Sequence, residues 1–127
     1  MKTYFISGHR NITENEFKTN YVPLLEKAAE EDSIFVVGDY YGVDIMSQNY
    51  LVDALQIDPN RITVYHMFES PRNINQKIKN TIGGFQSDTE RDAAMTDNSD
   101  EDIAFVRLST KMSGTGENIL RRHLLKI

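Results

Sequence analysis

The chain has 127 residues, a formal net charge of −5 and no cysteine. This length fits one domain over residues 1–127 with its own core, and the lack of cysteine excludes disulfides, thiolate metal sites and cysteine nucleophiles. The acidic balance argues against nucleic acid as a partner and favours a small molecule or a protein. No apolar run is long enough for a signal peptide or a membrane span, so we expect a cytoplasmic protein without a membrane partner.

A short apolar run at residues 4–6 predicts a first strand, which ends in the motif Ser7-Gly8-His9-Arg10. Thr13 and Glu16 form a capping box, and the apolar spacing after it predicts an amphipathic helix to about residue 29. Pro23 lies inside this pattern, so the helix should either kink there or be two pieces.

The most informative part of the chain is a strand–loop–helix pattern near its centre. Residues 34–37 are apolar and partly β-branched, which predicts a buried strand. Gly38 and Gly42 bracket the following turn, and a helical apolar pattern comes next. The glycines could serve only a tight turn, or the loop could bind a ligand at the helix N-terminus. Asp39 and Asp44 would repel a phosphate but suit ribose hydroxyls, which favours a sugar at this loop.

The second half of the chain continues the alternation of strands and helices. Residues 62–65 predict a third strand and residues 103–106 a fourth. Between them, the weakly patterned region 67–86 predicts a long loop, with a short helix or an extra strand at most and a flexible turn at residues 82–85. A second capping box, from Ser87 to Glu90, predicts a short helix that ends near Asp97.

Near the C-terminus, residues 113–118 form another glycine-bearing loop, and Ile119, His123, Leu124 and Ile127 outline a final helix. The whole pattern predicts a three-layer, Rossmann-like α/β fold with a mainly parallel sheet and right-handed crossovers. Loops that follow parallel strands meet at one edge of the sheet, and ligands bind there at the point where the strand order reverses. Three glycine-bearing loops at that edge favour a nucleotide, because backbone N–H groups can approach an anion where side chains are missing.

The pattern Gly-x-x-x-Gly-Val-Asp at residues 38–44, followed by an apolar helix, resembles the Gly-Gly-Ala-x-Gly-x-Asp segment of the SLOG superfamily. This superfamily consists of Rossmann-like proteins and includes YspA- and YpsA-like proteins, the DNA-processing protein DprA and the LOG phosphoribohydrolases. Ser7-Gly8-His9-Arg10 and Ser113-Gly114-Thr115 fit the same pattern, so the resemblance spans most of the chain. It implies a nucleotide-derived ligand in the edge cleft, bound by a sensor or sequestering module.

The resemblance also raises an enzymatic alternative, an N-glycoside hydrolase or deoxyribosyltransferase acting on nucleoside monophosphates. Enzymes of this kind carry a glutamate three positions after the threonine of the late loop. Counting from Thr115 gives Asn118, with Glu117 one place earlier. An amide cannot act as a nucleophile or a general base, so the sequence leaves open whether the protein is an enzyme. The candidate catalytic residues are Glu117, Asp44 and Asp92.

The candidate ligand-binding residues lie in these loops or on the short helix before the fourth strand. They are Ser7, Gly8, His9, Arg10, Gly38, Asp39, Gly42, Asp44, Arg91, Ser113, Gly114, Thr115, Gly116 and Asn118. Arg91 could pair with a phosphate or could simply be solvated. Tyr40 and Tyr41 could stack on a base or pack against another subunit, which leaves a homo-oligomer open. The three histidines lack metal-ligand spacing, so we expect no metal and no cofactor.

Overall fold

The computed structural model describes residues 1–107 and 113–125. The strands are β1 (Lys2–Ser7), β2 (Ser33–Val37), β3 (Ile62–Met67), β4 (Asn80–Phe85) and β5 (Glu101–Ala104). The helices are α1 (Glu14–Asn20), α2 (Val22–Glu30), α3 (Val43–Asn49), α4 (Asp88–Asp97) and α5 (Gly114–Leu125), together with a π-helical turn, η1 (Tyr50–Ala54), and a 3₁₀ turn, η2 (Pro59–Arg61).

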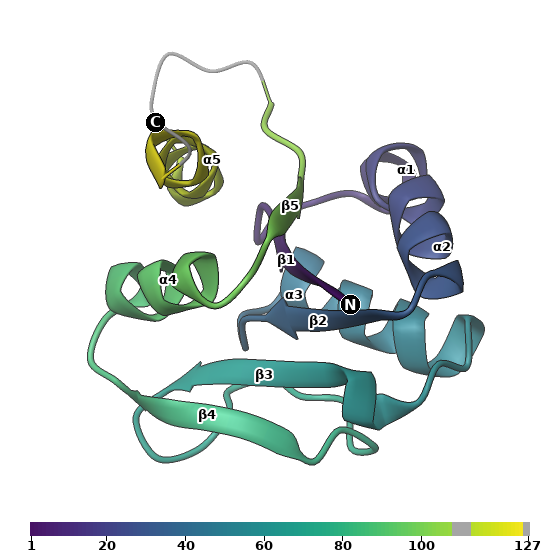
Figure 1. Ribbon diagram of the computed structural model, residues 1–127, viewed down its shortest axis with the longest axis horizontal. Helices are drawn as coiled ribbons and strands as arrows, with labels where there is room; N and C mark the ends of the chain where they lie inside the picture. The colour runs from purple at the N-terminus through teal and green to yellow at the C-terminus, as the bar shows by residue number, and fades with distance from the viewer. Residues whose placement is uncertain (108–112, 126–127) are drawn as a thin grey trace.

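The five strands form one parallel sheet in the order β4-β3-β2-β1-β5 (Figure 1). From β1 the chain moves outward through β2 and β3 to β4, and then returns to β5 on the other side of β1. The pairing of β1 with β5 runs from Tyr4↔Glu101 to Ser7↔Ala104. The strand order therefore reverses between β1 and β5, and the predicted three-layer, Rossmann-like α/β fold is confirmed.

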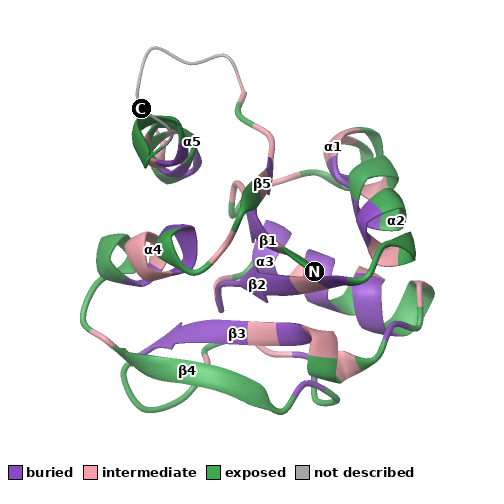
Figure 2. Ribbon diagram, viewed as in Figure 1, coloured by how far each residue is buried: buried purple, intermediate pink, exposed green. Residues whose placement is uncertain are grey.

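Alternating side chains of the strands build a core on each face of the sheet. On one face, Ile6 and Val37 pack with buried residues of α1, α2 and α3, such as Leu25 and Val43. On the other face, a smaller cluster of Phe5, Val36 and Tyr65 packs against Met95 of α4. Figure 1 shows α1 and α2 to one side of the sheet and α4 and α5 to the other, and Figure 2 shows the exposed edge strand β4.

The predicted helix starts follow from their caps. The Thr13 hydroxyl accepts a hydrogen bond from the Glu16 N–H (3.1 Å), and the Glu16 carboxylate accepts one from the Thr13 N–H (3.0 Å). Pro23 lies in the first turn of α2, where its missing N–H costs nothing, so the chain forms two helices here instead of one kinked helix. Ser87 caps α4 through the N–H of Glu90 (3.1 Å), and α4 ends at Asp97 as predicted.

The strand predicted near residues 103–106 and the extra strand allowed in region 67–86 are both present, but the bounds of the first and the turn predicted at residues 82–85 are wrong. The strand predicted at residues 103–106 is β5, which ends at Ala104 because the Phe105 N–H donates to the Tyr21 hydroxyl (3.0 Å) instead of to a neighbouring strand. The flexible turn predicted at residues 82–85 belongs to strand β4, which pairs with β3 at Tyr65↔Ile82 and Met67↔Phe85. Pairing between distant residues here outweighs the local signal of two consecutive glycines.

The final helix also differs from its prediction. Helix α5 starts at Gly114, so most of the predicted loop 113–118 is the first turn of the helix. Ser113 makes this start possible, because its hydroxyl accepts a hydrogen bond from the Gly116 N–H (2.9 Å). The predicted apolar stripe is not the buried face, since Ile119, His123 and Leu124 are exposed. Ile127 lies outside the described residues.

Tyr21 connects the helices to the carboxyl ends of β1 and β5, and its fully buried hydroxyl donates to the Ser7 carbonyl (2.7 Å) and accepts from the Phe105 N–H. We expect Tyr21→Phe to lower the free energy of unfolding by about 2–4 kcal/mol, since each buried polar group left unpaired costs roughly 1–3 kcal/mol. Urea denaturation measures this change. The matched control is Tyr50→Phe, which removes an exposed bond to Glu26 (2.8 Å). Equal losses for the two variants would contradict the expectation.

Candidate functional site

An open cleft of about 390 Å³ lies at the carboxyl ends of β1 and β5, where the strand order reverses. It brings together most of the residues that the sequence singled out. Those that line it are Ser7, Gly8, His9, Arg10, Asp44, Arg91, Asp92, Ser113, Gly114, Thr115 and Asn118. The loops after β1 and β2, helix α4 and the first turn of α5 therefore converge on one site.

Five predicted site residues do not line the cleft: Gly38, Asp39, Gly42, Gly116 and Glu117. Two of the glycines instead allow close packing around the cleft. A Cβ at Gly38 would lie 2.5 Å from Asp44 Oδ2 and 2.9 Å from Arg91 Cζ. Gly42 has a φ of 80°, and a Cβ there would lie 2.5 Å from Arg10 Cα. Gly42 thus lets the loops after β1 and β2 pack closely, and Gly38 leaves room for the side chains of Asp44 on α3 and Arg91 on α4.

Sequence reasoning missed several lining residues. Phe5, Asn11, Asp88 and Met95 also line the cleft, as do Tyr40 and Tyr41, for which the sequence left open stacking on a base or packing against another subunit. The rings of Tyr40 and Tyr41 lie 4.5 Å apart between centroids. Asp88 and Met95 lie on the same helix as Arg91, at helical spacing from it. That spacing was the available signal, because residues three and four positions apart on a helix share a face.

Asp39 is fully buried and holds the loop after β2 by charge. Its Oδ1 accepts hydrogen bonds from Arg72 Nη2 (2.9 Å) and Arg91 Nη1 (2.8 Å), and its Oδ2 accepts from Arg72 Nε (3.1 Å) and the Arg72 N–H (2.9 Å). Burial alone would raise the pKa of Asp39, but these bonds from Arg72, and the charges of both arginines, lower it. The Arg72 guanidinium also lies over the Tyr40 ring, 4.6 Å from its centroid.

Arg91 forms the charged floor of the cleft, with a side chain only 6 % exposed. Besides Asp39, it pairs with Asp88 (3.1 Å) and binds Asp92 Oδ1 through Nε (3.1 Å) and Nη2 (2.9 Å). Asn118 of α5 donates its side-chain amide to Asp92 Oδ2 (3.1 Å). The positive charge of Arg91 is thus matched by carboxylates of the protein itself, and Asn118 ties α5 to this network.

Asp44 is the cleft residue whose ionisation is most perturbed. Burial raises the pKa of its carboxyl to about 7, while the Arg91 charge and the Tyr40 N–H (3.1 Å) act in the opposite direction. It lies on the first turn of α3 and lines the cleft. A carboxyl that changes charge near neutral pH can donate or accept a proton there.

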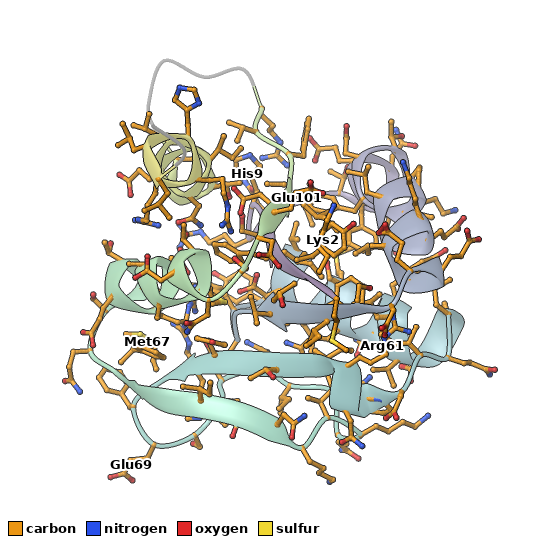
Figure 3. The ribbon with its side chains drawn as sticks, viewed as in Figure 1. Lys2, His9, Arg61, Met67, Glu69 and Glu101 are labelled. Atoms are coloured by element: carbon orange, nitrogen blue, oxygen red, sulfur yellow. The ribbon has the colours of Figure 1, made fainter. Side chains whose placement is uncertain are left out.

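Ser7 and His9 line the cleft from the end of β1. The Ser7 side chain is buried, and its hydroxyl makes no hydrogen bond within the part of the chain that the structure describes. The Nε2 of His9 accepts a hydrogen bond from the Arg107 N–H (3.2 Å), so the ring is neutral with its proton on Nδ1. Burial, followed by the Arg107 charge, lowers the pKa of His9. Figure 3 shows His9 between β5 and α5, whereas Lys2 and Glu101 lie at the amino ends of β1 and β5.

No family model, curated protein or solved structure matches the chain. The SLOG resemblance therefore stays a prediction. Over residues 1–107 and 113–125, no group of three or more histidine, cysteine, aspartate or glutamate side chains is arranged to hold a metal ion. Within the same ranges, none of the helices has the length and apolar character needed to cross a bilayer.

The raised pKa of Asp44 predicts a pH-dependent stability. Between pH 3.8, its ordinary pKa, and about pH 7, the carboxyl is protonated in the folded state and ionised in the unfolded state. The free energy of unfolding therefore falls as the pH rises through this range, and the loss is complete above pH 7. We expect Asp44→Asn to raise the free energy of unfolding at pH 8 by a few kcal/mol, at about 1.4 kcal/mol per pKa unit. At pH 4 the change should be small.

Urea denaturation at both pH values tests this expectation. The control is Asp32→Asn, which removes an exposed carboxylate and should change the stability little at either pH. A stabilisation by Asp44→Asn that is the same at pH 4 and pH 8 would show that Asp44 is ionised throughout.

Proposed function

We propose that the cleft binds a nucleotide-derived small molecule, as a sensor or sequestering module. The observation that carries this proposal is the buried Ser7 hydroxyl, which lines the cleft without a hydrogen-bond partner among the described residues. Buried polar groups are nearly always paired, so an unpaired one in a cleft suggests that a ligand group completes it. The position of the cleft at the reversal of strand order supports the same reading.

The chemistry of the walls suggests how such a ligand would lie. Asp44 and the Ser7 hydroxyl offer hydrogen-bonding groups suited to sugar hydroxyls. The first turn of α5, a helix of 12 residues, carries backbone N–H groups and a partial positive charge, which suit a phosphate together with Arg10. Tyr40 and Tyr41 provide aromatic faces for a base. The carboxylates Asp44, Asp88 and Asp92 favour a ligand with few negative charges.

Titration calorimetry with nucleosides and their 5′-monophosphates tests the proposal. We expect Ser7→Ala to weaken binding about tenfold, the effect of losing one hydrogen bond of roughly 1.4 kcal/mol. Ser47→Ala is a matched control, because Ser47 has the only other buried unpaired hydroxyl among the described residues and does not line the cleft. Arg10→Ala should weaken binding of the monophosphate more than that of the nucleoside.

The same titration can be made with the variant Gly114→Val, which we expect not to bind the monophosphate. Among the described residues, a Cβ at Gly114 meets no atom within 4 Å apart from its chain neighbours, so the fold should accept it while close approach of a phosphate is blocked. If the unaltered protein binds none of these nucleosides and monophosphates, the proposal is refuted. Equal losses for nucleoside and monophosphate with Arg10→Ala would show that the phosphate lies elsewhere.

A second candidate function, cleavage or transfer at the N-glycosidic bond of a nucleoside monophosphate, has one specific observation in its favour. The pKa of Asp44, raised by burial to about 7, suits a general acid or base at neutral pH. Against it, Glu117 does not line the cleft, and the amide of Asn118 hydrogen-bonds to Asp92. For this reason we favour binding without turnover.

Incubation of the protein with nucleoside monophosphates, followed by chromatography for free base, separates the two functions. Binding without turnover predicts no release of base above the rate of a sample without protein. If base is released, Asp44→Asn should abolish the release, since an amide cannot exchange a proton at neutral pH. Release that survives this substitution would exclude Asp44 as the acid or base, and any release at all would refute the sensor function.

A further inference from the structure

Helix α5 docks on the rest of the protein through polar side chains and exposes its apolar ones. Its buried residues are Thr115, Asn118 and Arg122. The exposed fractions of its large apolar residues are 40 % for Ile119, 47 % for Leu120, 59 % for Leu124 and 58 % for Leu125. These are four of the ten exposed large apolar residues in the described ranges, and they fall on one helix.

The orientation of α5 is set by specific contacts of the buried arginine. Arg122 donates to the carbonyls of Thr96 (3.1 Å) and Ser99 (2.7 Å) and pairs with Asp102 (3.1 Å). Together with the bond from Asn118 to Asp92, these contacts turn the polar face inward. Turning the helix to bury its leucines would leave the Arg122 charge and these carbonyls without their partners. The outward direction of the apolar face therefore follows from the fold.

Three of these four apolar residues form a continuous surface together with His123, whereas Leu125, seven positions after Asn118, lies on the side of Asn118. At about 100° per residue, Ile119, Leu120, His123 and Leu124 cover roughly 140° of the helix circumference. Gly116 lies on the same face, one turn before Leu120, and lets another helix approach closely. Figure 2 shows exposed residues along much of α5. We call this surface, made of Gly116, Ile119, Leu120, His123 and Leu124, the outer face of α5.

A hollow beside the outer face offers room for an apolar side chain. It measures about 330 Å³, lies between β5 and α5, and is lined by Asp102, Ala104, Ile119, Arg122 and His123. The outer face thus combines protruding leucines with an adjacent recess. A surface with both features can be complementary to itself, as a two-fold symmetric contact requires.

The charges along one flank of the outer face specify the direction of such a contact. Glu117 and Arg121 are both on this flank, one helical turn apart, and Arg121 uses Nη1 to donate to Asn118 Oδ1 (2.8 Å), which leaves its other N–H groups for a second partner. When two identical helices pack antiparallel, the same flanks of the two copies meet and run in opposite directions. Glu117 of each copy then lies beside Arg121 of the other. In a parallel pair this flank would instead meet the opposite one, which contains Ile119 and no charged partner.

We propose that two copies of this chain associate through the outer face of α5, with the two helices antiparallel about a two-fold axis. Small interfaces of this kind are weak and transient, typically burying less than about 1,200 Å² in total. The contact is on the side of α5 away from Arg122 and Asn118. It therefore leaves the cleft open, since no residue of the outer face lines the cleft.

Sedimentation velocity of the full chain, from about 1 µM to about 500 µM to cover weak association, tests the proposal. We expect a monomer–dimer equilibrium with the dimer dominant at the highest concentrations. Leu120→Asp should weaken the dimerisation constant at least tenfold, because it buries a charge at the centre of the contact. Leu24→Asp is the matched control, since Leu24 on α2 is also 47 % exposed but lies on the other side of the sheet.

A charge swap tests the antiparallel arrangement separately. Glu117→Arg and Arg121→Glu should each weaken dimerisation, and the double variant should restore it, because opposite charges again face each other across the two-fold axis. A chain that is monomeric over the whole range would overturn the proposal. So would dissociation by Leu24→Asp equal to that by Leu120→Asp. Failure of the double variant to rescue the single ones would overturn the antiparallel arrangement.

Discussion

The rest of the site depends on the pairing of the Asp39 carboxylate with Arg72 and Arg91. It is fully buried, yet it accepts four hydrogen bonds from Arg72 and Arg91. Through these bonds it ties together the loop after β2, the connection between β3 and β4, and helix α4. A buried charge is tolerated only with such complete pairing. The positions of these three segments therefore depend on one another. The ion cluster lies just behind the walls of the cleft and holds them in place.

This cluster also explains the unusual electrostatics of the cleft. Arg91 is held by Asp39, Asp88 and Asp92, so its charge is already balanced. Asp44, close by on α3, accepts its hydrogen bond from the Tyr40 N–H and makes no ion pair within the described ranges. With the arginine charge shared among the other carboxylates, burial dominates, and the pKa of Asp44 rises to about 7. One carboxyl is thus buried as an ion and its neighbour favours the neutral form.

The sequence predicted most of the fold because its signals are local. Apolar runs identified β1, β2 and β3, and the hydroxyls of Thr13 and Ser87 marked the starts of α1 and α4. Parallel strands then bring the loops that follow them to one edge, which is why most candidate residues line the cleft. An extra strand in region 67–86 was allowed for, but the bounds of β4 and the role of Arg72 were not predicted, because their partners, β3 and Asp39, are distant in the sequence. Local pattern carries no information about such pairs.

Helix α5 shows a different limit of sequence patterns. A helical period tells which residues share a face, but it does not tell which face points inward. In α5 the inward face is polar because Asn118 and Thr115 line a polar cleft and Arg122 binds backbone carbonyls. Leu120 and Leu124 must then face away from the cleft. The cleft and the outer face lie on different sides of one helix, so the proposed ligand and the proposed second copy would occupy separate surfaces. Both depend on the orientation that Arg122 and Asn118 impose on α5.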